Sequence, residues 1–193
     1  MKERIMQAFI EEIHDSGMKF TMDDLSKRLG ISKRTLYEHF SSKVEVLETI
    51  IDQTLQEADE KTRQIVLDER LSLLEKITGV MTVLPNHYEL YDLKILDQMK
   101  RYFPEQWAKI DAALKDDWDV LRMLIEQGIE EGLIVGKSPA LIMKLIVDAT
   151  NSILDQRFYL NNHINLDEAL SSIVEILLFG LVSREDRESS VPY

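Results

Sequence analysis

The chain contains no cysteine among its 193 residues, which excludes disulfide bonds and thiolate metal sites and is typical of a protein of the reducing cytoplasm. Its four histidines are scattered without the spacing of a zinc site. The sequence also lacks a phosphate-cradling glycine loop and the glycine-flanked serine of hydrolases. We therefore expect a cytoplasmic protein that is not an enzyme and holds neither a metal nor a cofactor.

Long apolar runs are missing as well. The longest nearly apolar stretch, residues 176–182, is far shorter than the roughly 20 residues that a bilayer requires. The N-terminus, MKERIMQAFIEEI, alternates charged and apolar residues at helical spacing and so differs from a secretory signal. These two features predict a protein with no membrane partner.

Strand-like alternation never persists, and the apolar residues recur at helical spacing throughout. The sequence therefore predicts an all-α protein. We expect helices over about residues 2–16, 43–66, 69–84, 87–102 and 105–131, followed by one that opens at Ser138 and Pro139 and one that opens at Asn165. The helix from residue 43 is too long for a small head and is expected to act as a connecting lever.

Residues 21–43, TMDDLSKRLGISKRTLYEHFSSK, predict two short helices joined by a glycine turn. Thr21 can cap the first helix, and Asp24, three residues on, can reach back to it. Gly30 can adopt the left-handed conformation that ends a helix, and Ser32 can cap the next one. This pattern is typical of a helix-turn-helix motif that reads DNA.

The second of these helices has one apolar and one polar face. Leu36 and Phe40 are spaced i, i+4 and are expected to point inward. The outward side is cationic and hydrogen-bonding, which suits phosphates and base edges, and carries Lys33, Arg34, Tyr37 and His39.

A further helix is expected to begin at Lys43, because Ser42 and Glu45 have the spacing of a second capping box. The helix dipole disfavours a cation at this end, so Lys43 needs another partner. A DNA phosphate beside the helix end would provide one. The alternative is a lysine that is simply solvated.

At these residues the sequence resembles the TetR/AcrR (tetracycline-repressor-like) family of bacterial transcriptional regulators, over about residues 5–47. The positions that carry the resemblance are Thr21, Leu25, Gly30, Ile31, Ser32, Thr35, Leu36, Tyr37, Phe40, Ser42 and Lys43. The resemblance implies a recognition helix in the major groove of double-stranded operator DNA. The predicted DNA contacts are Thr21, Ser32, Lys33, Arg34, Thr35, Tyr37, His39 and Lys43.

Because of three positions, the resemblance does not predict the operator sequence. Ser26 and Arg34 stand where the family commonly has smaller residues, and Arg34 adds a cation. Glu38 is either repelled by the DNA backbone or accepts a hydrogen bond from a cytosine amino group.

Charge is unevenly distributed along the chain. The net charge is −12, yet residues 1–48 carry eight basic and nine acidic side chains, whereas the remaining 145 residues carry 15 and 26. Five basic groups and one acidic group lie within residues 27–43. We expect a small basic tip on an acidic body, which would help to orient the tip toward DNA. A solubilising surface is the alternative explanation for most of the acids.

The last two helices predict a homodimer. From Ile173 onward the final helix is apolar on most sides, whereas a helix on a monomer's surface needs only one apolar stripe. A palindromic operator also requires two reading heads. The predicted interface residues are Ile142, Ile146, Ile173, Leu177 and Leu181. The alternative is that both helices lie centrally in a monomeric bundle.

The middle of the chain is rich in aromatic residues and methionine, which either fill the core or line an adaptable cavity. Three polar residues at i, i+3 and i+7 spacing also share one side of an apolar helix and need partners there. A cationic or donor-rich effector would be such a partner; hydrogen bonds across a dimer interface or to solvent are the alternative. The candidate effector contacts are Met81, Tyr88, Tyr91, Met99, Trp118, Asp148, Asn151 and Asp155.

The sequence thus predicts a helix-turn-helix DNA-binding domain at residues 1–47, an effector-binding and dimerisation domain at 48–183 and a flexible tail at 184–193. The predicted function is a dimeric transcriptional regulator, a repressor that a small-molecule effector releases from DNA by shifting the separation of the two heads. Two alternatives are an effector-independent architectural DNA-binding protein of the same fold and a helical adaptor that binds only protein.

Overall fold

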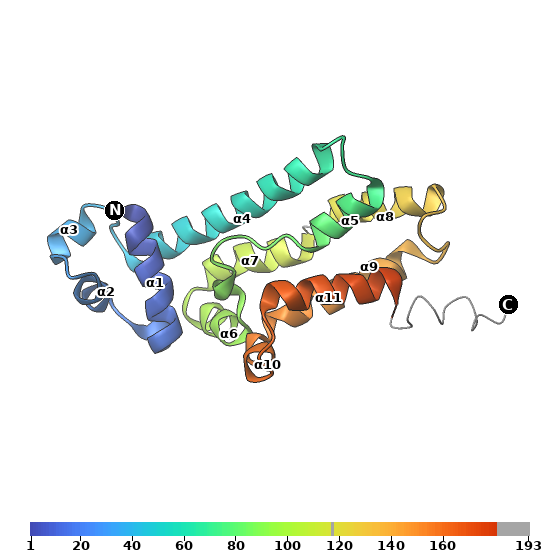
Figure 1. Ribbon diagram of the computed structural model, residues 1–193. Helices are drawn as coiled ribbons and strands as arrows, with labels where there is room; N and C mark the ends of the chain where they lie inside the picture. The colour runs from blue at the N-terminus through green and yellow to red at the C-terminus, as the bar shows by residue number, and fades with distance from the viewer. Residues whose placement is uncertain (117, 181–193) are drawn as a thin grey trace.

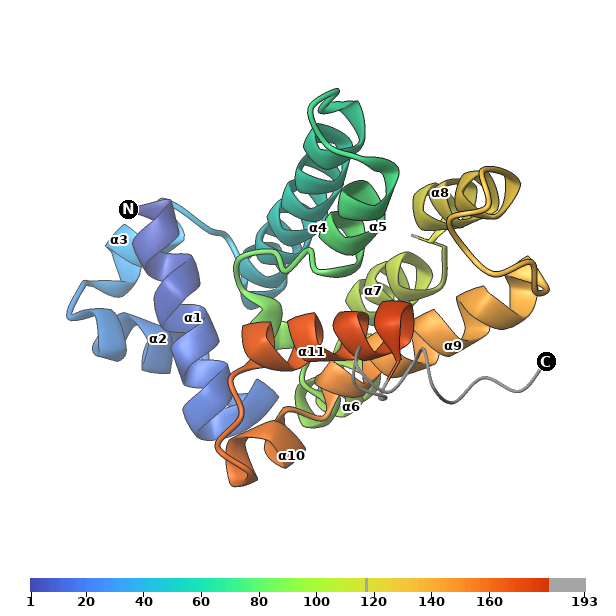
Figure 2. The same ribbon diagram turned by 45° about the vertical axis from the view of Figure 1, so that its right-hand side comes forward.

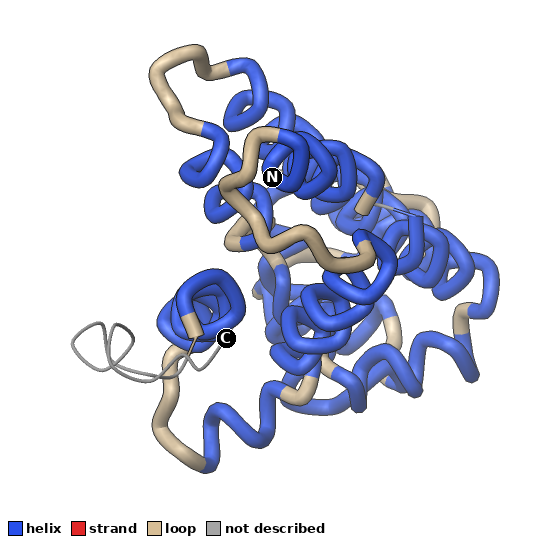
Figure 3. Tube along the Cα trace, turned by 90° about the vertical axis from the view of Figure 1, so that its right-hand side faces the viewer, coloured by secondary structure: helices blue, strands red, loops and turns tan. Residues whose placement is uncertain are grey.

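The computed structural model describes residues 1–116 and 118–180 of the chain. All regular structure in these ranges is helical (Figures 1 and 3), which confirms the predicted all-α class. The elements are α1 (Lys2–Ser16), η1 (Gly17–Lys19), α2 (Met22–Leu29), α3 (Lys33–Tyr37), α4 (Lys43–Leu67), α5 (Leu73–Met81), η2 (Tyr88–Tyr91), α6 (Leu93–Tyr102), α7 (Pro104–Asp116), α8 (Asp119–Glu130), α9 (Pro139–Asn151), η3 (Ser152–Leu154), α10 (Gln156–Asn161) and α11 (Leu166–Phe179).

The N-terminal head folds as its capping residues predict. Thr21 and Asp24 form a capping box at the start of α2, and Gly30 ends that helix with φ 65°. Gly17, at φ 69°, ends α1, and a Cβ at this position would lie 2.6 Å from Gln98 Oε1. Leu36, in α3, is fully buried against the other head helices. Local hydrogen bonds therefore fix the head's turns, and its apolar side chains fix its packing.

Helix α4 begins in the head and runs along the body as a single 25-residue helix (Figure 1), close to the predicted residues 43–66. The capping at its start differs in one detail from the prediction. Ser42 Oγ accepts the Glu45 N–H, but the Glu45 carboxylate is bonded by the N–H and hydroxyl of Ser41 instead of returning to Ser42. The predicted domain boundary at residue 47 falls inside this helix.

The hydrophobic core of the head continues into the body. Leu36 and Leu47 belong to the same buried cluster as Leu96, Met99 and Ile110 from α6 and α7. A second cluster joins α5, α8, α9 and α11, with α11 lying beside α9 (Figures 1 and 2). No helix in the described part of the chain is both long and apolar enough to span a membrane.

The body helices are shorter than expected. Ser72 and Glu75 form a capping box that starts α5 at Leu73, and Asp92 caps α6 separately from η2. The expected helix over residues 105–131 is two helices, α7 and α8. The turn η3 and the short helix α10 between α9 and α11 were not predicted, because Asp155 caps α10 within a segment without clear periodicity. The predicted tail lies outside the described residues.

Candidate nucleic-acid interface and effector cavity

Helix α3 lies at the outer end of the head, on the side away from α8 and α11 (Figure 1). Ser32, Lys33, Arg34 and Tyr37 are exposed, whereas Thr35 and His39 are half-buried. Tyr37 is 49% exposed, which is unusual for a side chain with a large aromatic ring. An exposed aromatic ring beside two cations is a surface that can meet phosphate and base edges.

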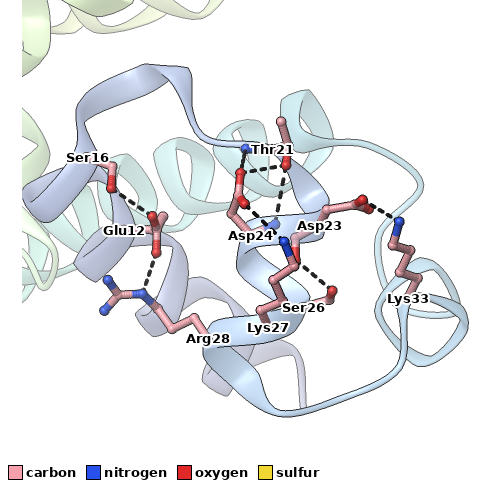
Figure 4. A network of polar contacts seen from close by, with 9 residues as sticks. All are labelled: Glu12, Ser16, Thr21, Asp23, Asp24, Ser26, Lys27, Arg28 and Lys33. Carbon is pink, nitrogen blue, oxygen red and sulfur yellow. Dashed lines mark hydrogen bonds and ion pairs between the residues drawn. The ribbon is translucent and has the colours of Figure 1, made fainter.

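Both cations of α3 are held by carboxylates of the head. Lys33 pairs with Asp23 of α2 (Figure 4), and Arg34 Nε lies 3.2 Å from Glu38 Oε1 one turn along. All four side chains are well exposed, so each pair contributes little to stability. Glu38 thus pairs with the Arg34 guanidinium in the free protein, and the two effects on DNA binding expected of this acid stay predictions.

The hydroxyl groups predicted to contact DNA already serve the head itself. Thr21 Oγ1 donates to Asp24 Oδ2 at 2.6 Å, and Ser32 Oγ accepts the Thr35 N–H at 3.0 Å. Ser32 Oγ and Thr35 Oγ1 are also 2.8 Å apart. These groups set the start of α2 and α3, and so position the face that Lys33, Arg34 and Tyr37 present.

Lys43 requires a correction. Its ammonium was expected to lack a partner within the chain, but Nζ donates to the carbonyl oxygens of Met18 at 2.8 Å and Phe20 at 2.6 Å. It also lies 3.7 Å from the centre of the Phe20 ring, where a cation is favoured. The N–H of Met18 in turn donates to Gln98 Oε1 of α6 at 2.7 Å. Lys43 thus binds the η1 segment to the start of α4, and Gln98 binds it to α6 of the body.

Burial lowers the pKa of Lys43 from 10.5 to about 8, although Asp24 and Glu12 act in the opposite direction. The unfolded chain binds this proton more tightly than the folded chain does. The pH-dependent part of the contribution of Lys43 to the free energy of unfolding is therefore fully present above pH 10.5 and is lost as the pH falls through 8. We therefore expect the free energy of unfolding of the wild type to rise relative to Lys43→Met between these pH values, as measured by urea unfolding. If the free energy of unfolding of Lys43→Met changed with pH in parallel with that of the wild type, the lowered pKa of Lys43 would be contradicted.

Arg28 organises a second network that sequence reasoning missed. Its guanidinium is paired with Glu11, Glu12 and Asp15 along α1, and Glu12 also accepts the Ser16 hydroxyl (Figure 4). Hydrogen bonds to Asp15 and Glu12 raise the pKa of Arg28 above its usual value. The spacing of the three acids on α1 was the available signal. Arg28 thus fixes α2 against α1 and is committed to the head's own structure.

A cavity of about 180 Å³ opens in the body between α4, α5, α7, α9 and α11. Its wall is mainly aliphatic and aromatic, which is typical of small-molecule sites. The lining residues are Leu55, Ala58, Thr62, Val80, Met81, Val83, Leu84, Pro85, Tyr88, Tyr91, Ala113, Trp118, Thr150, Asn151, Ile153, Leu154, Leu166 and Leu170.

The cavity brings together five of the eight predicted effector contacts, namely Met81, Tyr88, Tyr91, Trp118 and Asn151. The other three lie elsewhere. Met99 is fully buried in the core shared with the head. Asp148 is exposed and pairs with Lys144, at 2.6 Å, and Asp155 caps α10. The helical spacing of Asp148 and Asp155 was misleading, because the first faces solvent and the second follows a change to η3.

One wall of the cavity, residues 82–87, is fastened to α4. Lys61 Nζ donates to the Leu84 carbonyl at 2.9 Å and pairs with Glu57 at 2.7 Å, and Glu57 accepts the Asn86 N–H at 3.1 Å. His87 ends this segment at φ 64°, which is rare for a residue with a Cβ. The helix that enters the head therefore both lines the cavity and holds its wall.

The predicted dimer residues divide into three groups. Ile146 is 3% exposed and packs inside the second core, so its prediction as an interface residue is wrong. Ile142, Ile173 and Leu177 are half-buried, and Leu181 lies outside the described residues. The exposed apolar residues of α9 and α11 are instead Leu141, Leu145, Ile176 and Phe179.

Comparison with known proteins relates the whole chain to bacterial regulators. Residues 5–50 match the family described as bacterial regulatory proteins, tetR family. The uncharacterised HTH-type transcriptional regulator YvaF of Bacillus subtilis is 30% identical over 190 residues, which cover 98% of this chain and all of YvaF.

Solved structures share the fold. The TetR family regulator PfmR from Thermus thermophilus has a TM-score of 0.74 at 22% identity, with 93% of this chain and all of PfmR covered. The structure of AibR, determined with isovaleryl coenzyme A and operator DNA, has a TM-score of 0.66 at 21% identity over 93% of this chain and 98% of AibR. At these identities the likeness concerns the fold.

Proposed function

The chain belongs to the tetR family of bacterial regulatory proteins, and from this premise we propose that it is a dimeric transcriptional repressor whose affinity for operator DNA falls when a small molecule occupies the body cavity. Membership makes it a DNA-binding transcriptional regulator and not an enzyme. We propose in addition that it forms a dimer, that it represses transcription, that it responds to an effector and that it acts in the cytoplasm.

We propose that Lys33, Arg34 and Tyr37 meet the DNA, because they are the exposed residues of α3, the helix at the outer end of the head (Figure 1). Asp23 and Glu38 hold the two cations in place until phosphates or base edges replace them. Lys43 is left out of this set, since two carbonyl oxygens already accept its hydrogen bonds.

The observation that carries the effector proposal is that α4 belongs to both sites. Its first turn packs in the core of the head, and Leu55, Ala58 and Thr62 line the cavity farther along. A ligand that shifts α4 also shifts the head, because Met18 of the head is hydrogen-bonded both to Lys43 of α4 and to Gln98 of α6. A cavity with these connections favours the effector-responsive regulator over the architectural alternative. AibR, which has the same fold, was solved with both a small molecule and operator DNA.

Filling the cavity tests this coupling. Ala113 of α7 lines the cavity, whereas its neighbour Ala112 is exposed, so Ala113→Phe and Ala112→Phe form a matched pair. We expect Ala113→Phe to bind operator DNA but to lose at least tenfold of the response to a compound found by screening for release of DNA. Overpacking costs about 1–3 kcal/mol, and a melting curve shows whether the variant is folded. Ala112→Phe should keep the full response, measured by fluorescence anisotropy of labelled DNA. A full response in folded Ala113→Phe would place the effector elsewhere.

A further inference from the structure

We propose that the cavity takes a neutral, ring-sized apolar molecule that carries one hydrogen-bonding group, with the side-chain amide of Asn151 as the group that selects it. The inference rests on the proposed function, because it names the class of ligand for the same cavity. It also separates this chain from AibR, whose structure contains a coenzyme A thioester.

The volume sets the size of the ligand. An apolar cavity of about 150 Å³ in a protein interior accepts benzene, and this one is about 180 Å³. A single substituted ring or a short branched chain therefore fills it. The wall presents the side chains such a molecule prefers, with Met81, Leu170 and the ring of Trp118 among them.

The uncharged wall of the cavity indicates that the ligand is neutral. Among the described residues no charged side chain lines the cavity. Lys61, next in sequence to the lining residue Thr62, is already paired with Glu57 and bonded to the Leu84 carbonyl. A ligand phosphate needs Arg or Lys partners when it leaves water. The 145 residues after Glu48 moreover carry 26 acidic against 15 basic side chains, which repels a polyanion.

Asn151 supplies the hydrogen-bonding specificity. Its side chain is half-buried at the cavity wall, and it makes no hydrogen bond with any other described residue. The adjacent Thr150 shows the contrast, since its hydroxyl donates to the Ile146 carbonyl at 2.8 Å. A ligand that fills the cavity removes water from this half-buried amide, and an amide then left without a partner is unfavourable. A ligand hydroxyl or carbonyl at this position would satisfy the amide, and a purely apolar ligand would not.

The test compares two probes of nearly equal size, benzyl alcohol and toluene, with isovaleryl coenzyme A as the charged competitor. Binding to the full-length protein is followed by chemical shifts of the methyl groups of Met81 and Leu170, without DNA. We expect both small probes to bind in the cavity. We expect isovaleryl coenzyme A at equal concentration to leave toluene bound.

Asn151→Leu keeps the size of the side chain and removes the amide. It should lower the preference for benzyl alcohol over toluene by about tenfold, because an unsatisfied buried group costs about 1–3 kcal/mol. Asn161→Leu makes the same substitution at an exposed position of α10 and should leave the preference unchanged. Thermal melting confirms that both variants fold.

Three results would overturn the proposal: no binding of either small probe, an unchanged preference in folded Asn151→Leu, or displacement of toluene by isovaleryl coenzyme A. None of these measurements involves DNA. Failure of the proposed function would look different, since the probes would then bind as described while the affinity for DNA stayed constant.

Discussion

Replacing Arg34 by alanine is expected to weaken binding of the dimer to its operator by about 2–6 kcal/mol, since a bidentate contact to a base is worth about 1–3 kcal/mol and two heads each lose one. Arg34 is the most suitable group for such a contact because its side chain is 90% exposed and Glu38 orients its guanidinium. The measurement is a titration of labelled operator, selected from a random-sequence library, and of an unrelated duplex. The loss should be much smaller on the unrelated duplex.

Arg63→Ala provides the control, because Arg63 is an exposed arginine of α4 that also pairs with a glutamate of its own helix, Glu60, and lies outside the head. It should bind DNA as the wild type does. Lys33→Ala should weaken binding to both duplexes and reduce the salt dependence by about one phosphate contact per head. Equal losses on both duplexes for Arg34→Ala would make Arg34 a phosphate contact, and no loss in either variant would remove α3 from the interface.

Placing a charge at Leu145 or at its neighbour Ile146 should have two different large effects. Leu145 is 54% exposed in the single chain and Ile146 is 3% exposed. Leu145→Glu should therefore give a folded monomer with much weaker operator binding, because an ionised group in an apolar dimer interface costs several kcal/mol without a partner. Ile146→Glu should unfold the chain itself, since the same charge would enter the second core.

Sedimentation and thermal melting distinguish these two effects. The control is Leu160→Glu, which adds the same charge at an exposed leucine of α10, outside the two helices α9 and α11. It should remain a folded dimer. If Leu145→Glu stayed dimeric at micromolar concentration, the exposed faces of α9 and α11 would not form the interface.

The accuracy of the sequence predictions follows the range of the interactions. Thr21, Asp24 and Gly30 were assigned correctly because capping depends on residues three or four apart. Lys43 was not, because the carbonyl oxygens that bind it belong to Met18 and Phe20, more than 20 residues earlier. A helix with two apolar faces likewise does not reveal which face meets the core, so Ile146 and Leu145 could not be told apart.

The residues that line the cavity could likewise be predicted only in part from the sequence. Aromatic and methionine content identified Met81, Tyr88, Tyr91, Met99 and Trp118 as candidates. Four of the five line the cavity, whereas Met99 lies in the core shared with the head. The aliphatic walls from α4 and α11 were not foreseen, since their apolar periodicity looks the same whether a side chain fills a core or borders a cavity. Asp148 shows a signal that was available and unused: Lys144, four residues earlier, pairs with it.

Coupling between the cavity and the DNA face is tested most directly by the operator affinity of the wild type while the cavity is filled. The dissociation constant for the selected operator should be measured by anisotropy at increasing concentrations of a cavity ligand, with occupancy followed by the methyl shifts of Met81. The dissociation constant should rise about 5- to 150-fold and level off when the cavity is saturated, and the ligand should bind more weakly by the same factor when operator is present. An operator affinity that stays constant while the cavity saturates would contradict this coupling.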